Sequence, residues 1–222
     1  MKKTGNGAQE FCYDPVAAIN YLAKIDDKLG QLMQRIGPYT MQIRSMHNPF
    51  EALARNIIFQ QLHTNAATVI HGRVVALFGK GKLHPQDILA ASEETLRSAG
   101  LSRAKLAALK DLAAKTLDGT VPSLARLRRM EDEEIIQRLT AVRGIGRWTV
   151  EMLLIFRLGR PDVLPIDDFA VRKGFAITYE LAEMPKPKAL KEYGERWRPY
   201  RTVASWYMWR AVRPEQKTPT PE

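Results

Sequence analysis

The stretch between residues 135 and 156 constrains the fold more than any other part of the chain. Apolar residues at helical spacing end near Val142, and a second such run begins within one turn of Gly146. Only a very tight reversal fits between these two predicted helices. Gly144 and Gly146 permit it because glycine adopts positive φ angles freely, and Ile145 between them can fill the gap between the helices. The sequence therefore predicts two helices joined by a short hairpin.

The predicted hairpin also has the features of a phosphate-binding site. Backbone N–H groups in the first turn of a helix have no intrahelical acceptor, and the helix dipole favours an anion at that end. Arg143 and Arg147 stand beside this turn. An ordinary tight turn between two packed helices explains Gly-Ile-Gly equally well when that tripeptide is taken alone.

The charge of the chain favours a polyanionic partner. Its 222 residues contain 34 Lys and Arg against 24 Asp and Glu, a formal net charge of +10. A basic surface without a bound partner is the alternative. No apolar run approaches the roughly 18 residues of a membrane span, and no apolar signal core follows Met1. We therefore expect no membrane association and an intracellular location, in the bacterial cytoplasm or, in a eukaryote, the nucleus.

The single cysteine narrows the chemistry further. Cys12 excludes an intramolecular disulfide and any four-cysteine zinc or iron-sulfur site within this sequence. Free cysteines behave as small apolar side chains, so we expect Cys12 to be a buried, inert thiol.

Apolar residues recur at helical spacing along most of the chain, and strand-like alternation is almost absent, so the fold is predicted to be all-α. A first amphipathic run covers residues 15–29, and Thr64 and Ser102 are expected to cap the helices that end near residues 78 and 117. Further helices are predicted at about residues 50–62, from Pro85 onward, and at about 93–99, 123–129, 131–140, 147–158, 168–180, 186–196 and 200–212.

Several motifs in a fixed order resemble one known family. They are the hairpin at residues 142–149, the loop Gly159-Arg160-Pro161, the sequence Leu164-Pro165-Ile166-Asp167-Asp168, the helix end at residues 57–63, and residues 197–201 leading to Trp206 and Trp209. Together they resemble the helix-hairpin-helix DNA glycosylase superfamily, and within it the 3-methyladenine DNA glycosylase II type. The resemblance covers about residues 45–212, and the ordered series is far more specific than a lone hairpin.

The resemblance implies a fold, an activity and a partner. It implies two helical lobes with the active site in the cleft between them, formed by one module over residues 1–213, with a disordered tail at 214–222. It implies a monomer that binds double-stranded DNA, flips an alkylated base such as 3-methyladenine out of the helix and hydrolyses its N-glycosidic bond. The N-terminal β-rich domain of some relatives has no counterpart here, so the chain resembles a compact form.

The position two residues after the second hairpin glycine separates two reaction classes. Bifunctional relatives, which also cut the DNA strand, carry a Schiff-base lysine there. This chain has Trp148, and an indole cannot form an imine, so the resemblance implies a monofunctional enzyme that leaves an abasic site.

A carboxylate is needed because breaking an N-glycosidic bond builds positive charge on the sugar, which an ionised carboxylate stabilises. The residues around Asp168 fit the family's aspartate better than a frame that starts at Asp167. Both aspartates could instead simply cap the following helix, since Asp is a common N-cap residue. We assign catalysis to Asp168 and capping or loop organisation to Asp167.

Aromatic residues are the expected contacts for the base. Alkylated purines are cationic, and a cation over an aromatic ring is stabilised by about 0.5–2 kcal/mol. By resemblance, Trp148 and Trp209 match pocket aromatics, with Met152 where the family has a tyrosine. Ordinary core packing is the alternative for a tryptophan, and it is the role we expect for Trp197 and Trp206.

The helix end at residues 57–63 matches the segment that fills the space of the flipped nucleotide. Gln61 matches the intercalating position, Leu62 is the alternative wedge, and His63 is a predicted minor-groove contact. A polar helix end facing solvent is the competing interpretation. The resemblance also implies a monovalent cation on the backbone carbonyls of Thr140, Val142 and Ile145; no other cofactor is expected.

Two further functions stay open on sequence grounds. One is a non-catalytic DNA-binding module that keeps the hairpin, and the other is a glycosylase for a deaminated or oxidised purine. An intact carboxylate disfavours the first, because an anion gains nothing against a phosphodiester backbone.

Overall fold

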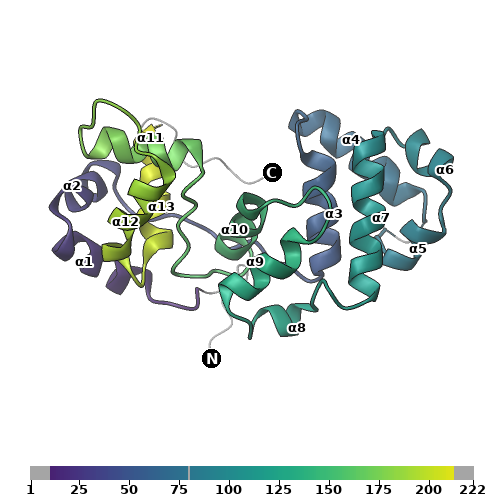
Figure 1. Ribbon diagram of the computed structural model, residues 1–222, viewed down its shortest axis with the longest axis horizontal. Helices are drawn as coiled ribbons and strands as arrows, with labels where there is room; N and C mark the ends of the chain where they lie inside the picture. Colours follow the sequence, from purple (N-terminus) through teal and green to yellow (C-terminus); the bar gives the residue numbers. More distant parts are fainter. Residues whose placement is uncertain (1–10, 80, 213–222) are drawn as a thin grey trace. The chain divides into compact units, whose positions relative to one another are not determined.

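The computed structural model describes residues 11–79 and 81–212. Across these residues the chain forms helices, turns and loops with no strand, so the predicted all-α fold is confirmed (Figure 1). The tail predicted to be disordered, residues 214–222, lies outside the described residues. The chain divides into two compact units, Met46–Val150 and, together, Met1–Ser45 with Glu151–Glu222.

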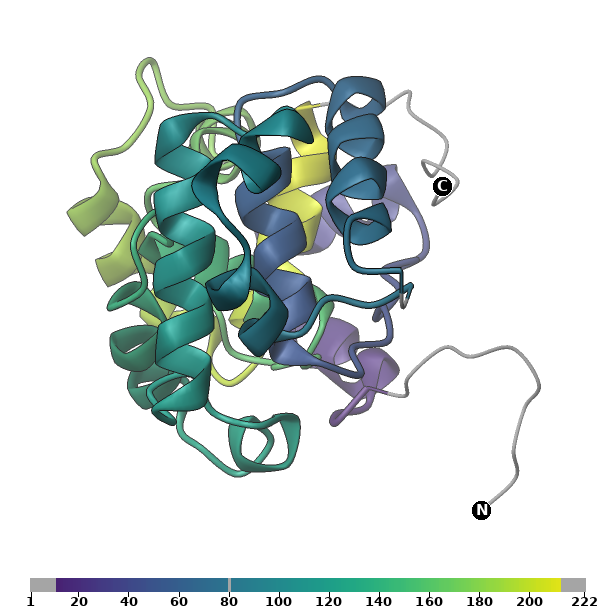
Figure 2. The same cartoon turned by 90° about the vertical axis from the view of Figure 1, so that its right-hand side faces the viewer.

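The unit formed by Met46–Val150 is built around one long helix, α7. Ser102 caps this helix as predicted, its hydroxyl accepting the Lys105 N–H at 3.3 Å. α7 packs against α3 and α5, as both views show (Figure 1, Figure 2). The helices of this unit are α3 (Pro49–Phe59), α4 (Thr64–Ala76), α5 (Pro85–Ala90), α6 (Glu93–Ser98), α7 (Arg103–Leu117), α8 (Leu124–Leu127), α9 (Asp132–Thr140) and the first turn of α10 (Arg147–Phe156).

The other unit is centred on α13, which packs along α11. At their crossing a side chain on Gly174 would collide with the Met208 carbonyl, so only glycine lets the two backbones approach this closely. The helices of this unit are α1 (Pro15–Ile25), α2 (Asp27–Ile36), the remainder of α10, α11 (Phe169–Thr178), α12 (Pro187–Gly194), the 3-10 turn η1 (Glu195–Trp197) and α13 (Arg201–Val212).

A buried aspartate divides the first predicted helix into two. The sequence predicts one amphipathic run over residues 15–29, but the chain breaks at Asp26, whose carboxylate caps α2 through the Leu29 N–H. Asp26 also accepts hydrogen bonds from Tyr179, Tyr193 and the indole N–H of Trp197, which satisfy its charge at 6% exposure. The period-3.6 pattern does not reveal this break, because the aromatic donors that satisfy the buried carboxylate are 153 to 171 residues away in sequence.

Two smaller predictions are wrong. Thr64 is already inside α4, whose N-cap position is His63, and that side chain makes no cap hydrogen bond. Cys12 is exposed rather than buried, and its thiol donates to the carbonyl of Gly159 at 2.9 Å. Its neighbours Phe11 and Tyr13 are half-buried, and the side chain between them lies at the surface.

None of the helices formed by residues 11–79 and 81–212 has both the length and the apolar character that crossing a lipid bilayer requires.

Candidate functional site

Asp168 is fixed at the head of α11 by two N–H donors. Its Oδ1 accepts the backbone N–H of Val171 at 2.9 Å, which makes it the N-cap of the helix, and the indole N–H of Trp209 at 3.0 Å. Its own N–H donates to the Pro165 carbonyl at 3.0 Å, and the residue is half-buried. The capping role predicted for Asp167 is therefore wrong, because the N-cap is Asp168 and Asp167 is an exposed neighbour. A role of Asp167 in loop organisation stays a prediction.

Trp209 lies beside this carboxylate on α13. Its ring stacks on Phe156 of α10 with centroids 5.6 Å apart and planes at 27°, while its N–H is directed to Asp168. Trp197 and Trp206 are buried, at 0% and 5% exposure, which confirms their predicted core role. Sequence reasoning missed both Phe156 and the bond to Asp168, because no local pattern pairs residues 41 positions apart.

The other two predicted pocket residues lie on α10. Trp148 is in its first turn and is 50% exposed, an unusual state for so large an aromatic side chain. Met152 is half-buried one turn further along. Trp148 belongs to the unit Met46–Val150, whereas Met152, Trp209 and Asp168 belong to the other unit.

The predicted hairpin joins α9 to α10. Ile145 is buried at 4% exposure, as expected for a plug between the helices. Gly144 has a φ of +79°, and a side chain there would touch Ala108 of α7 at 3.4 Å. Gly146 is different: its φ is not positive and a side chain would meet open space. The turn therefore needs glycine only at 144, not at both positions.

Two side chains outside the motif hold the hairpin in place. The Asp111 carboxylate on α7 accepts a hydrogen bond from the Arg143 N–H at 2.7 Å and forms an ion pair with Lys115 at 2.7 Å. Burial alone would raise the pKa of Asp111, but these hydrogen bonds outweigh it and hold the pKa below its ordinary value. On the other side, the Gln60 amide donates to the Gly144 carbonyl at 2.9 Å. The sequence gives no local signal for either contact.

The two arginines of the hairpin differ in their surroundings. The side chain of Arg143 is exposed. Arg147 instead forms a two-point ion pair with Glu133 of α9, Nη1 to Oε1 at 3.1 Å and Nη2 to Oε2 at 2.9 Å. A phosphate at this turn would have to compete with Glu133 for Arg147.

The predicted wedge forms the turn between α3 and α4. Gln61 has a φ of +56°, a conformation that non-glycine residues rarely adopt, and both Gln61 and Leu62 are exposed. His63 is exposed as well. Lys105 of α7 braces the preceding helix end, since its ammonium donates to the Ile58 carbonyl at 2.6 Å. A strained, exposed turn on a braced helix end suits the predicted role of this segment as a wedge in the base stack.

The hairpin carbonyls offer oxygen ligands of the kind that alkali cations take. The Val142 carbonyl accepts the Ile145 N–H at 3.1 Å, so it would offer a cation only its second lone pair. A cation on the carbonyls of Thr140, Val142 and Ile145 stays a prediction. No cluster of His, Cys, Asp or Glu suited to a metal ion occurs in the part of the chain that the structure describes.

The class of protein follows from three features together: the two-unit all-helical fold, the glycine-containing hairpin and the aspartate that caps α11. The family model of HhH-GPD superfamily base excision DNA repair proteins matches residues 54–199. The chain belongs to this superfamily.

The names of several similar proteins and solved structures refer to 3-methyladenine. DNA-3-methyladenine glycosylase 1 of Schizosaccharomyces pombe is 38% identical over 193 residues, covering 86% of this chain and 84% of that protein. A solved structure of the S. pombe 3-methyladenine DNA glycosylase in complex with abasic DNA matches with a TM-score of 0.75 and 35% identity, covering 90% of this chain and all of that one. The DNA-3-methyladenine glycosidase of Bacillus halodurans matches with a TM-score of 0.81 and 33% identity over 92% of both chains.

Proposed function

We propose that this protein is a monofunctional DNA glycosylase that excises alkylated bases such as 3-methyladenine in base excision repair. The observation that carries the proposal is the Asp168 carboxylate, fixed by the N–H groups of Val171 and Trp209 at the head of α11. The names of the relatives support the same activity and the same class of base. Because genomic DNA is the substrate, the enzyme acts inside the cell.

The chemistry requires a fixed negative charge more than a strong acid. An alkylated purine is already a cationic leaving group, so departure of the base leaves an oxocarbenium-like sugar that the carboxylate stabilises. Two N–H donors on one oxygen hold the Asp168 side chain in a single orientation, so the charge need not reorganise during bond cleavage. Water then completes hydrolysis and leaves an abasic site.

The remaining residues divide between base and backbone. Trp148, exposed at 50%, and Trp209 supply aromatic surface for a cationic base, and Met152 of α10 is the third proposed pocket residue. The phosphodiester backbone is contacted by the hairpin, which consists of Arg143, Gly144, Ile145, Gly146 and Arg147. The space that the flipped nucleotide leaves in the duplex is filled by the wedge turn, which consists of Gln61, Leu62 and His63.

The proposal is tested by incubating the protein with methylated duplex DNA and measuring free base by chromatography. We expect release of 3-methyladenine, strands that break only after alkali, and no borohydride-trapped adduct, because Trp148 replaces the Schiff-base lysine. Binding without release would favour a non-catalytic module, and release of only deaminated or oxidised purines would assign a different lesion. A trapped adduct would show that an amine attacks the sugar.

A further inference from the structure

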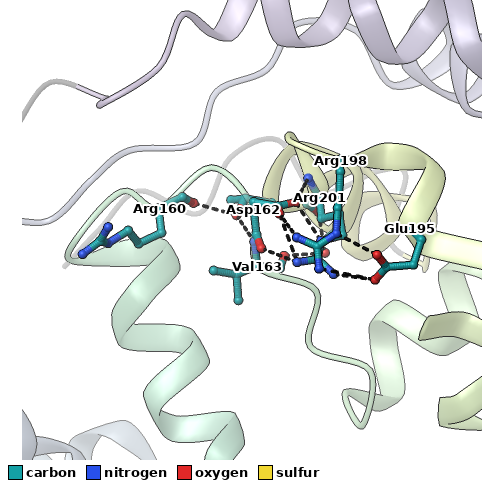
Figure 3. Close-up of polar contacts among 8 residues, drawn as sticks. Arg160, Asp162, Val163, Glu195, Arg198 and Arg201 are labelled. Carbon is teal, nitrogen blue, oxygen red and sulfur yellow. Dashed lines mark hydrogen bonds and ion pairs between the residues drawn. The ribbon is translucent and has the colours of Figure 1, made fainter. Parts of the chain in front are cut away.

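The loop that leads to Asp168 is tied to the start of α13 by a cluster of four charged residues. Asp162 accepts two hydrogen bonds from the Arg201 guanidinium, Nε to Oδ1 at 2.7 Å and Nη2 to Oδ2 at 3.0 Å. Arg198 bridges Asp162 and Glu195, and Glu195 also pairs with Arg201 at 3.1 Å. Figure 3 shows Asp162 facing both guanidinium groups, with Glu195 on their other side. We call these four residues the Asp162 cluster.

The Asp162–Arg201 pair of this cluster is more enclosed than an ordinary surface ion pair. The side chains of Arg201 and Asp162 are only 13% and 19% exposed, and their two-point geometry fixes direction as well as distance. Exposed pairs contribute little because solvent screens them, whereas a half-buried bidentate pair keeps its geometry. This arrangement is therefore suited to hold one segment in register against another.

Backbone groups of the loop join the same junction. The Thr202 hydroxyl donates to the Arg160 carbonyl at 2.7 Å and accepts the Val163 N–H at 3.0 Å, while the Thr202 N–H donates to the Pro161 carbonyl at 2.9 Å. Thr202 is fully buried. These three polar contacts thus fasten the loop at residues 160–163 to the first turn of α13.

α13 returns to the same segment of chain at its other end. Arg201 and Thr202 are in its first turn, and Trp209, about two turns later, donates its indole N–H to Asp168. Between them, the Met208 backbone lies against Gly174 of α11, the helix that Asp168 caps. The segment 160–168 is thus held by both ends of one helix.

We propose that the Asp162 cluster and Thr202 are positioning residues that set the place of Asp168 through α13 and the Trp209 indole. The inference rests on the proposed function, because it assigns these residues to the orientation of that carboxylate. A shift at the start of α13 is carried along the helix to Trp209, which then no longer holds Oδ1 in its productive place. Misplacement of a catalytic group by as little as 1 Å can slow a reaction by about 100-fold.

The test is a double-mutant cycle on single-turnover excision from methylated DNA. Asp162→Asn should slow excision by about tenfold in the wild-type background and by less than about twofold in the Trp209→Phe background, where the link is already cut. Equal slowing in both backgrounds would overturn the inference. An inactive wild type would instead overturn the proposed function, so the two failures are distinguishable.

The indole N–H resonances report the link without any reaction. Asp162→Asn should move the Trp209 resonance in a ¹⁵N spectrum, that resonance being assigned by its loss in Trp209→Phe. Asp26→Asn is the matched control. It also breaks a polar cluster in the same unit, but the Asp26 carboxylate accepts from the Trp197 indole and not from Trp209. It should move the Trp197 resonance, lower Tm and leave the excision rate of the folded protein unchanged.

A second pair of variants covers the case in which Asp162→Asn does not fold. Thr202→Val removes the hydroxyl at nearly constant volume, and Thr202→Ser keeps it. Slow excision and a moved Trp209 resonance in Thr202→Val, both restored in Thr202→Ser, would support the positioning role. An unmoved resonance and a normal rate in Thr202→Val, with only a lower Tm, would reduce the junction to fold stability and contradict the inference.

Discussion

Glu133 holds Arg147 by a two-point ion pair, with N–O distances of 3.1 and 2.9 Å, at the turn where the hairpin is proposed to contact phosphate. The side chains of Arg147 and Glu133 are 47% and 59% exposed, so the pair is accessible to a competing anion. A carboxylate in this place occupies the same two donors that a phosphate would take. The proposed phosphate contact at Arg147 would therefore have to displace Glu133.

Removal of the competing charge should strengthen DNA binding. Glu133→Gln is expected to raise the affinity for both damaged and undamaged duplex by up to about fivefold at low salt, the range of an exposed ion pair of 0.2–1 kcal/mol. Arg147→Ala should weaken both and lower the salt slope by about 0.9. Binding titrations at several salt concentrations measure both effects.

Glu134→Gln is the matched control for this prediction. Glu134 lies on the same helix and pairs with Arg138 at 3.0 Å, so Glu134→Gln changes the net charge equally but leaves the Glu133–Arg147 pair in place. Equal gains from the two substitutions would show that Glu133 acts only through net charge.

The hairpin glycines should respond differently to alanine. Gly144→Ala forces a side chain into the left-handed region, at φ +79°, and should lower the free energy of unfolding by about 1–3 kcal/mol. Gly146→Ala should be close to neutral for stability, because its φ is ordinary and the space beside it is open. Denaturant unfolding of the two variants decides this, and equal losses would show that both positions are strained.

The wedge turn offers a substitution that should separate stability from activity. Gln61→Gly relieves a left-handed φ of +56° and should raise Tm, since that conformation costs a non-glycine residue about 1–2 kcal/mol. It also removes the side chain proposed to fill the base stack, so excision from duplex DNA should fall.

Glu180→Gly is the control for the wedge, because Glu180 has the same φ of +56° in an exposed turn of the other unit. It should raise Tm slightly less, because it also removes the exposed Lys28–Glu180 ion pair at 3.0 Å, and it should leave excision unchanged. If Gln61→Gly also excises at the wild-type rate, Gln61 is not the intercalating residue and Leu62 becomes the candidate.

Asp111 should make the hairpin sensitive to acid. Its pKa lies below the unfolded value of about 3.9, so its stabilisation is complete above that pH and is lost as the pH falls through the folded pKa. Asp111→Ala should remove about 1–3 kcal/mol of stability at neutral pH, the range for a hydrogen bond to a charged group, and should flatten this acid dependence. The measurement is thermal unfolding between about pH 2 and pH 7, which spans the range in which carboxylates titrate.

Asp118→Asn serves as the control for Asp111, since Asp118 also has a lowered pKa but accepts from Thr120 at the end of α7, not from the hairpin. Asp111→Ala should weaken the binding of damaged and of undamaged DNA by a similar factor. Asp118→Asn should change neither affinity. A loss confined to damaged DNA would assign Asp111 to the base pocket instead of to the hairpin.

The sequence predicts the helices well because their apolar spacing and caps are local. Ser102 caps α7 as expected, and the hairpin lies where the apolar runs required it. The additional hydrogen bonds of Asp26 and Asp168 come from distant donors, Trp197 and Trp209, so no local pattern in the sequence predicts them.

The same limit applies to the candidate site. Residue types that suit the chemistry can be identified along the chain, but their supporting contacts join positions far apart in sequence. The bond of Asp111 to the Arg143 N–H joins residues 32 apart, and that of Gln60 to Gly144 joins residues 84 apart. Gly146 shows the converse error, since a glycine in a motif need not have a positive φ.

The charge of Asp168 can be removed with little change in shape. Asp168→Asn keeps an oxygen that can accept from Val171 and Trp209, so the cap and the loop should persist. The measurement is the single-turnover release of 3-methyladenine from methylated DNA, beside binding of the same DNA and beside Asp167→Asn. Asp168→Asn should bind normally but lose at least about two orders of magnitude in rate, as expected for an electrostatic stabiliser, while Asp167→Asn stays active. Near-normal release by Asp168→Asn, with Asp167→Asn inactive, would contradict the assignment of the catalytic carboxylate.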